Sequence, residues 1–557
     1  MIKCTAPIRG HRSPRAERDC PRCGNRPAKT SRNSESQYSH AERVKQLSKT
    51  PKLPFAPEQC SDIRRILNET TTKRTHIPLT IARTQWAAGP GFFHTGTIRS
   101  KGMQFTYVYD CGTARSLDLL QKEIDTYLES IRRPWTYTPH TASEFYLYGN
   151  APYFDLSRNH YLHTIYKSLH KRNYSFSGTP FTTEWDDAPE QTTQPSHIDI
   201  VFISHFDTDH INGLAYLIQN TIVKILAIPF TTPRERFLHL CKSTFANNAS
   251  MNRARSGEYY DFILEFTASP AGAIRRFPEF LNREASDITL IEIQHERDNE
   301  GHGRHDFTHP VYTPANSSGD NNNKKHEAIP VWLFSASTLQ GNADELGAEL
   351  IDSLIKQGII DSESDLENAT TLQYIFDRKD ISSKIADTYR SIAHKNLNAT
   401  SLILHSGPAH PENSPAFHHM FWRGDQTHKF HSILEVHSPW ATGWLGCGDA
   451  NLKKATNVNL FDQLFWKQKL FSSTFAPPHH GSQHDWNQHL LDAFGYPSES
   501  APVCVFSADG LYKHPSPNVI ADANSRGSTT YVVTTDPKSR LTETLAILVP
   551  TDKIRFY

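Results

Sequence analysis

The sequence has no long hydrophobic run and no leader-like start. Its 557 residues contain no stretch of eighteen consecutive apolar residues, and its first residues lack the apolar core of a signal peptide. These absences argue against a membrane-spanning helix. They predict a soluble, cytoplasmic protein with no membrane partner.

Excess charge and disulfide-type cysteine spacing are also absent. Lys and Arg together number 59, as do Asp and Glu, so no whole-molecule field favours a particular partner. The eight cysteines are scattered, which argues against a disulfide framework. Cys20 and Cys23 form a C-x-x-C half-site for zinc that Cys4, His11 or Cys60 could complete. The alternative is a disordered basic arm.

Hydrophobic patterning divides the chain into four parts. Residues 1–75 are basic and polar, which predicts a disordered arm. Residues 76–231 combine strand and helix patterns, and strand patterns return in residues 396–557. Residues 232–395 contain helical segments and the polar loop "NSSGDNNNKKHE", which predict a large mixed insertion. Strands and helices on both sides of an insertion favour a layered α/β domain.

The segment "SHFDTDHINGL", residues 204–214, is the strongest functional signal. It follows the apolar run "IDIVFI" and places His205, Asp207, Asp209 and His210 within six positions. In an extended segment, side chains two residues apart point to the same side, and His210 would begin a helix. One loop could therefore present two ligand pairs to two adjacent metal ions. The alternative is a polar helix start, where Asp is favoured.

Two later segments support the metal interpretation. "LGCGDAN" ends a strand pattern at Asp449, where a carboxylate could bridge two ions. "APPHHGSQHD" ends another strand pattern with His479 and His480, and either imidazole could be a ligand. Of the neighbouring polar residues, we expect His484, Asp485 and Cys447 to be bystanders.

In this order, the segments resemble the metallo-β-lactamase superfamily, whose signature H-x-H-x-D-H precedes a His, a late Asp and a final His. The variant H-x-D-x-D-H with "PHHGS" and "HPSP" is similar to the metal-hydrolase domain of ComEC-type competence proteins, here in a stand-alone form. "QFTYVYDCGT", "NATSLIL" and "SADGLYKHPSP" also resemble segments of that branch. The resemblance covers about residues 77–557, interrupted by the insertion. It implies an αββα sandwich.

The resemblance also implies roles for individual residues. Two divalent ions, Zn²⁺ or Mn²⁺, would be held by His205, Asp207, Asp209, His210, Asp449 and His479 or His480. Asp209 and His514 would be catalytic, with His514 acting as a phosphate-facing acid or electrophile. The alternative for His514 is a turn residue ahead of Pro515. Asp110 would orient a ligand histidine.

Two positions depart from the superfamily signature. Asp207 replaces the second histidine, and Asn398 stands at the place of the middle histidine, with His405 as an alternative. The resemblance nevertheless implies a hydrolase that uses a metal-activated water, acting as a phosphodiesterase or nuclease on DNA or nucleotides. Two alternatives stay open. One is a hydrolase of small esters or lactones, and the other is a metal-binding scaffold that docks a protein partner through residues 232–395.

Overall fold

The structure is a computed structural model, and the residues it describes all lie within the compact unit Cys60–Tyr557. They are 76–100, 103–132, 197–245, 260–281, 288–294, 305–311, 329–339, 342–393, 400–414, 416–424, 440–492, 494, 501–510 and 513–550. The predicted arm, its Cys20–Cys23 pair, Asn398 and the polar loop of the insertion lie outside these ranges.

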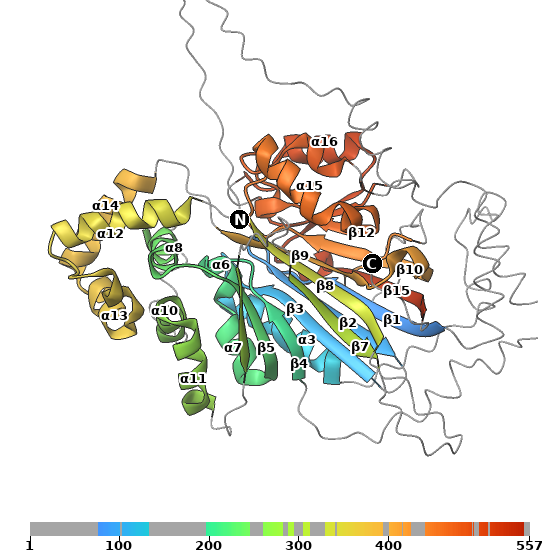
Figure 1. The fold of residues 1–557 in the computed structure, drawn as a ribbon, viewed down its shortest axis with the longest axis horizontal. Helices are drawn as coiled ribbons and strands as arrows, with labels where there is room; N and C mark the ends of the chain where they lie inside the picture. The colour runs from blue at the N-terminus through green and yellow to red at the C-terminus, as the bar shows by residue number, and fades with distance from the viewer. Residues whose placement is uncertain are drawn as a thin grey trace, which may run out of the picture. The chain divides into compact units, whose positions relative to one another are not determined.

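Two β-sheets pack face to face (Figure 1). The first has the strand order β10-β15-β1-β2-β3-β4-β5-β6, and the second has the order β14-β13-β12-β11-β9-β8-β7. The first sheet contains β1 (His76–Gln85), β2 (Phe93–Ser100), β3 (Met103–Cys111), β4 (His197–Phe202), β5 (Ile222–Pro229), β6 (Thr289–Ile293), β10 (Ala416–Arg423) and β15 (Leu541–Pro550). The second contains β7 (His305–Val311), β8 (Ile329–Leu339), β9 (Ser401–Pro408), β11 (Gly443–Gly446), β12 (Ser472–Ala476), β13 (Val503–Ser507) and β14 (Thr530–Val533).

Alternation along the strands separates the inner faces of the sheets from the outer ones. On β3, Tyr107 and Tyr109 point into the core between the sheets, where they meet Phe334 and Trp444 of the second sheet. Val108, between them, packs in the outer core with the helices. This period of two is what a strand buried on both faces requires.

A layer of helices covers the outer face of each sheet. Helices α3 (Leu117–Arg132) and α7 (Leu214–Asn220) pack on the first sheet. Helices α15 (Ala455–Leu470) and α16 (Pro517–Ser525) pack on the second sheet and lie together at the top of Figure 1. The layers are therefore helix, sheet, sheet, helix, and the predicted αββα fold is confirmed.

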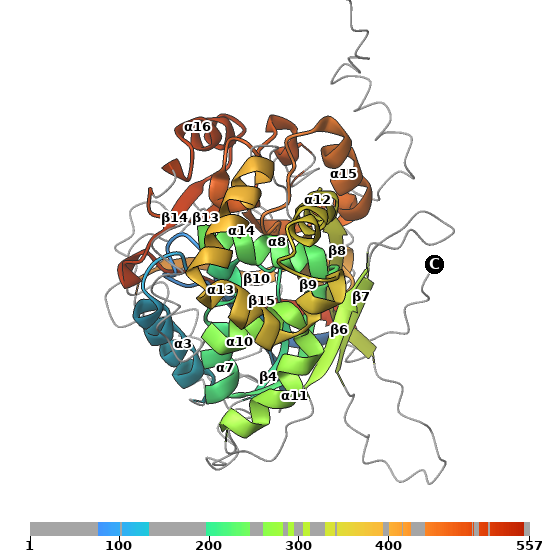
Figure 2. The same cartoon turned by 90° about the vertical axis from the view of Figure 1, so that its left-hand side faces the viewer.

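The predicted insertion, residues 232–395, contains both a helical group and strands of the sandwich. Its helices pack against one another at the left of Figure 1 and face the viewer in Figure 2. They are α8 (Pro233–Phe245), α10 (Tyr260–Ala268), α11 (Pro270–Leu281), α12 (Ala343–Lys356), α13 (Ala369–Asp377) and α14 (Lys379–Ala393). Strand β6 joins the first sheet, whereas β7 and β8 join the second. No helix within the described ranges combines the length and apolar character needed to cross a bilayer.

A buried ion pair lies between strands β1 and β15. Arg83 and Glu543 are cross-strand neighbours, and the Arg83 Nη2 atom lies 2.8 Å from Glu543 Oε2. The same carboxylate accepts hydrogen bonds from His419 at 2.7 Å and from the hydroxyls of Ser473 and Thr474. Both oxygens of Glu543 therefore have donors supplied by the protein.

Candidate metal centre

The predicted ligands meet at one edge of the sandwich because their strands run in parallel. Strand β3 pairs in parallel with β4, and β11, β12 and β13 pair in parallel in succession. In such sheets, side chains that follow the carboxyl ends of the strands converge. Asp110 lies at the end of β3, the loop of residues 205–210 follows β4, and Asp449 follows β11. His479 and His480 follow β12 in the same way.

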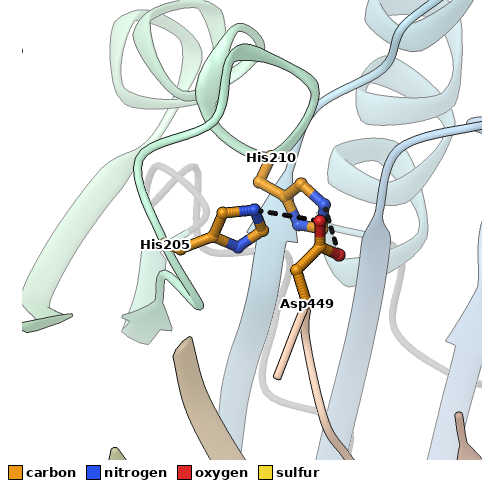
Figure 3. A group of neighbouring side chains, drawn as sticks. All are labelled: His205, His210 and Asp449. Carbon is orange, nitrogen blue, oxygen red and sulfur yellow. Dashed lines mark ion pairs between the residues drawn. The ribbon is translucent and has the colours of Figure 1, made fainter. Parts of the chain in front are cut away.

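The carboxylate of Asp449 reaches two fully buried imidazoles that lie side by side (Figure 3). Its Oδ2 atom is 3.4 Å from Nε2 of His205, and its Oδ1 atom is 3.5 Å from Nε2 of His210. His205 comes from the loop after β4, His210 comes from the short helix α6 (Thr208–Ile211), and Asp449 follows β11 of the opposite sheet. These three side chains form one group with metal-ligand spacing.

A second group shares His210 with the first. It consists of Asp209, His210 and His480, and the His480 Nε2 atom lies 3.7 Å from Asp209 Oδ2. Asp209 is partly exposed, whereas both histidines are buried. We call the five residues of the two groups the centre: His205, Asp209, His210, Asp449 and His480.

Orienting hydrogen bonds fix the ligand atoms. Asp110 Oδ2 lies 2.8 Å from Nδ1 of His210, which leaves Nε2 of that ring for the centre. Asp110 also accepts the backbone N–H and the hydroxyl of Ser204. On the other sheet, Ser401 Oγ accepts the backbone N–H of Asp449 at 3.0 Å. Asp110 thus has the orienting position expected for it, since a metal-bound imidazole usually donates its second N–H.

Two glycines allow the loops to approach one another. A Cβ atom at Gly112 would lie 2.3 Å from the backbone of Asp209. Gly448 has a φ of +52°, and a Cβ there would lie 2.5 Å from Ser401 Oγ. Only glycine fits both positions without displacing the ligand loops.

The histidine pair after β12 adopts a strained backbone. His479 and His480 have φ values of 46° and 54°, in the left-handed region that residues other than glycine seldom occupy. The two side chains diverge: His480 joins the centre, while the Nε2 atom of His479 lies 3.5 Å from Asp449 Oδ2. The other ring nitrogen of His479 lies 2.7 Å from Asp485 Oδ2, so Asp485 is not the bystander that we expected.

Asp207 is held by a different set of partners. Its Oδ1 atom lies 2.7 Å from Nδ1 of His239, and its Oδ2 atom forms an ion pair with Nζ of Lys242. His239 and Lys242 lie on α8, three residues apart on the same helical face. Burial alone would raise the pKa of Asp207, but Lys242 and His239 hold it well below its usual range.

The charges of the centre favour protonated imidazoles as long as no ion is bound. Burial alone would lower the pKa of His210, yet the carboxylates of Asp110 and Asp449 raise it well above its usual value. Burial also opposes charge on His479, but Asp449 and Asp485 raise its pKa to about 9. A divalent ion would compete with these protons, because imidazole binds metals in its neutral form.

Buried polar atoms without partners indicate that the centre fits a metal ion. Within the described part of the chain, the Nε2 atoms of His205, His210 and His480 and the Oδ1 atom of Asp449 have no hydrogen-bond partner. Buried polar atoms are almost always satisfied, so such a convergence calls for a ligand. Imidazole nitrogens combined with carboxylate oxygens suit Zn²⁺ and Mn²⁺.

The structure places the remaining predicted residues as follows. His405 packs along β9 beside Gly407 and Gly443 and takes no part in the centre, to which β9 contributes the hydroxyl of Ser401. The His514 ring lies 5.4 Å from the His479 ring, at the rim of the centre. His239 and Lys242 were not predicted, because an imidazole and an ammonium on an otherwise amphipathic helix carry no sequence signal.

Comparison with known proteins supports this assignment. Residues 177–321 match the family model described as the metallo-beta-lactamase superfamily. No curated protein matches the chain. The matched range contains the H-x-D-x-D-H loop, and the two-sheet architecture agrees with the match. Residues 177–321 are therefore similar to the metallo-beta-lactamase superfamily, and this similarity suggests a metal-dependent hydrolase.

Proposed function

We propose that the protein hydrolyses phosphodiester bonds, in nucleic acid or nucleotides, with divalent Zn²⁺ or Mn²⁺ at the centre. The observation that carries this proposal is the convergence of three imidazole nitrogens without hydrogen-bond partners on two carboxylates: the Nε2 atoms of His205 and His210 face Asp449, and that of His480 faces Asp209. A bound divalent ion supplies Lewis acidity and lowers the pKa of water. The similarity of the H-x-D-x-D-H and "PHHGS" segments to ComEC-type proteins supports a phosphodiester over other substrates.

The residues of the chain would orient the reactants around that ion. Asp110 fixes the His210 ring, so its Nε2 atom faces the centre. Asp209 is the partly exposed carboxylate of the centre, and we assign it to holding and orienting the attacking water. Asp485 fixes the ring of His479 and directs its Nε2 atom toward Asp449.

We assign His514 to contact with a substrate phosphate, because its ring lies 5.4 Å from that of His479. Burial and the neighbouring His479 lower the pKa of His514 to about 4, so this imidazole is neutral at pH 7. A neutral imidazole donates one hydrogen bond to a phosphate oxygen and does not deliver a proton readily. Of its two predicted roles, we therefore assign His514 that of an electrophile. Lys513 is exposed beside it and adds positive charge for an anionic substrate.

The test is cleavage of single- and double-stranded DNA and of a chromogenic phosphodiester, with Zn²⁺ and Mn²⁺ supplied separately. We expect Asp209→Asn to reduce the rate by more than roughly 100-fold and His514→Gln by roughly 10- to 100-fold. Asp361→Asn, an exposed substitution on a helical connection, should keep the wild-type rate.

Two results would overturn the proposal. Bound ions without phosphodiester cleavage would reject the substrate class and direct the search to small esters and lactones. Failure to bind Zn²⁺ or Mn²⁺ would reject the hydrolase itself. In that case, the scaffold that docks a partner through residues 232–395 becomes the proposal to test.

A further inference from the structure

Both oxygens of Asp207 already have protein partners. It is buried, its Oδ1 atom meets His239 at 2.7 Å, and its Oδ2 atom is paired with the Lys242 ammonium. The same Oδ2 atom also lies 3.4 Å from the Nε2 atom of His205. Among the described residues, the two groups with metal-ligand spacing both exclude Asp207. The motif position that the sequence assigns to a ligand is thus occupied by an internal ion pair.

His210 further restricts the number of ions. It belongs to both groups, but its Nδ1 atom is held by Asp110 at 2.8 Å, so only Nε2 faces the centre. A ring nitrogen has one lone pair and binds one ion. The two groups are therefore not two independent sites, because they depend on the same nitrogen.

The ammonium group of Lys242 occupies the place where a second metal ion would otherwise lie. A second ion near His205 would lie beside Asp207, whose Oδ2 atom is 3.4 Å from His205 Nε2, and would meet the ammonium group of Lys242 at the same carboxylate. Like charges at such close range repel strongly inside a protein. Lys242 is positioned by the α8 backbone, and its side chain is only 26% exposed, so it cannot move away freely.

We propose that Lys242 takes the place of a second metal ion, so that the centre binds one divalent ion per chain. That ion is bound by the Nε2 atom of His210, which both groups share, and by the other residues of the centre: His205, Asp209, Asp449 and His480. Lys242 is a positioning residue: it neutralises Asp207 and, together with His239, fixes the loop that carries His205 and Asp209. This inference rests on the proposed function only in requiring that the centre binds a divalent ion.

The first test is the number of ions per chain, measured by elemental mass spectrometry and native mass spectrometry after equilibration with Zn²⁺ or Mn²⁺. We expect one ion in the wild type and one in Lys242→Arg, which keeps the charge. Lys242→Met frees the carboxylate of Asp207 and should raise the number to two. Circular dichroism checks that each variant is folded.

A matched pair of aspartates makes the test independent of Lys242 variants. Asp207→Asn should still bind one ion, because Asp207 is not a ligand, whereas Asp209→Asn should bind none after the same equilibration. Both substitutions remove one carboxylate from the same loop and preserve its size.

The possible results separate this inference from the proposed function. Two ions in the wild type, or loss of the ion in Asp207→Asn, would overturn the role of Lys242 and leave the hydrolase proposal intact. A single ion in folded Lys242→Met would also overturn it. No ion in the wild type would overturn both.

Discussion

Two buried carboxylates, Glu543 and Asp449, differ in what surrounds them. Glu543 lies between the sheets, where Arg83, His419, Ser473 and Thr474 supply donors to both of its oxygens. Asp449 lies at the edge, where the imidazoles approach to 3.4 and 3.5 Å and its Oδ1 atom has no hydrogen-bond partner among the described residues.

The difference separates a structural network from a ligand site. A buried carboxylate with a full set of donors stabilises the fold only as part of that set. A buried carboxylate that faces imidazoles without hydrogen-bond partners indicates a ligand from outside the chain. Charge and burial are alike in the two places, so it is the completeness of the partners that distinguishes them.

The substitution Glu543→Gln should have the largest effect on stability. The Gln amide nitrogen would replace the oxygen that accepts hydrogen bonds from Arg83 and Thr474, so donors would face a donor. The Arg83 guanidinium would also stay buried without a counter-charge. We expect the free energy of unfolding to fall by roughly 3–5 kcal/mol, measured by urea denaturation. Asp387→Asn, which breaks the exposed pair with Arg390, should change it by less than about 0.5 kcal/mol. Equal effects of the two substitutions would contradict the comparison.

Acid should destabilise the folded protein through the same network. Burial would raise the pKa of Glu543, but Arg83 and His419 lower it from 4.5 to about 2. Burial likewise lowers the pKa of His94 and of His419. The unfolded chain therefore binds these protons more readily than the folded one, and the free energy of unfolding decreases as the pH is lowered.

For the histidines, the loss of stability begins below about pH 6.5, and for Glu543 it runs between about pH 4.5 and 2, amounting to roughly 3 kcal/mol. Thermal unfolding with a chelator present should show both phases. The phase below pH 4.5 should become shallower in Glu543→Gln. If wild type and variant had the same profile in this range, Glu543 would not be the titrating group.

Asp449→Asn should act on the ion and leave the network of Glu543 intact. Because Asp449 connects His205 and His210, we expect metal affinity to fall by more than roughly 100-fold, beyond the loss typical of residues that only orient a ligand. In the wild type, a saturating ion at about 100 times its dissociation constant should stabilise the fold by about 2.7 kcal/mol. Thermal unfolding with and without Zn²⁺ measures both quantities. A full metal-dependent shift in the variant would exclude Asp449 as a ligand.

Asp110→Asn should give a smaller loss at the same site. The Asn side chain can still accept from Ser204, but it no longer places a negative charge on the Nδ1 side of His210. We expect metal affinity to fall about 10- to 100-fold, as for other residues that orient a ligand. Competition with a chromogenic chelator gives the affinity, and the exposed substitution Asp118→Asn serves as the control. A loss as large as that of Asp449→Asn would place Asp110 among the ligands.

Much of the fold can be predicted from local patterns. The apolar run before the H-x-D-x-D-H loop forms β4, and the Leu and Ile spacing after Asp110 forms α3. Strands β6, β7 and β8 fall inside the predicted insertion, because polar segments such as "NSSGDNNNKKHE" separate them. Strand β15 pairs with β1 across more than 450 residues, a partnership that periodicity cannot reveal.

The centre likewise contains residues that the sequence predicts and residues that it does not. The spacing of His and Asp in the H-x-D-x-D-H and "PHHGS" segments predicts metal ligands. The structure brings together His205, Asp209, His210, Asp449 and His480. The partners of Asp207 could not be predicted from the sequence. Lys242 and His239 reach it only because α8 folds back over the loop, and a partly buried, ion-paired ammonium on a helix has the same local pattern as a solvated one.

The pairing of β1 with β15 has a consequence for how the protein acquires its centre. The first sheet is completed only when residues 541–550 reach residues 76–85, and the ligands themselves span positions 205 to 480. Contacts so distant along the chain form late in folding. A nascent chain would therefore emerge from the ribosome with its imidazoles still apart. The complete centre therefore requires both sheets, and we expect tight capture of an ion only by the folded domain.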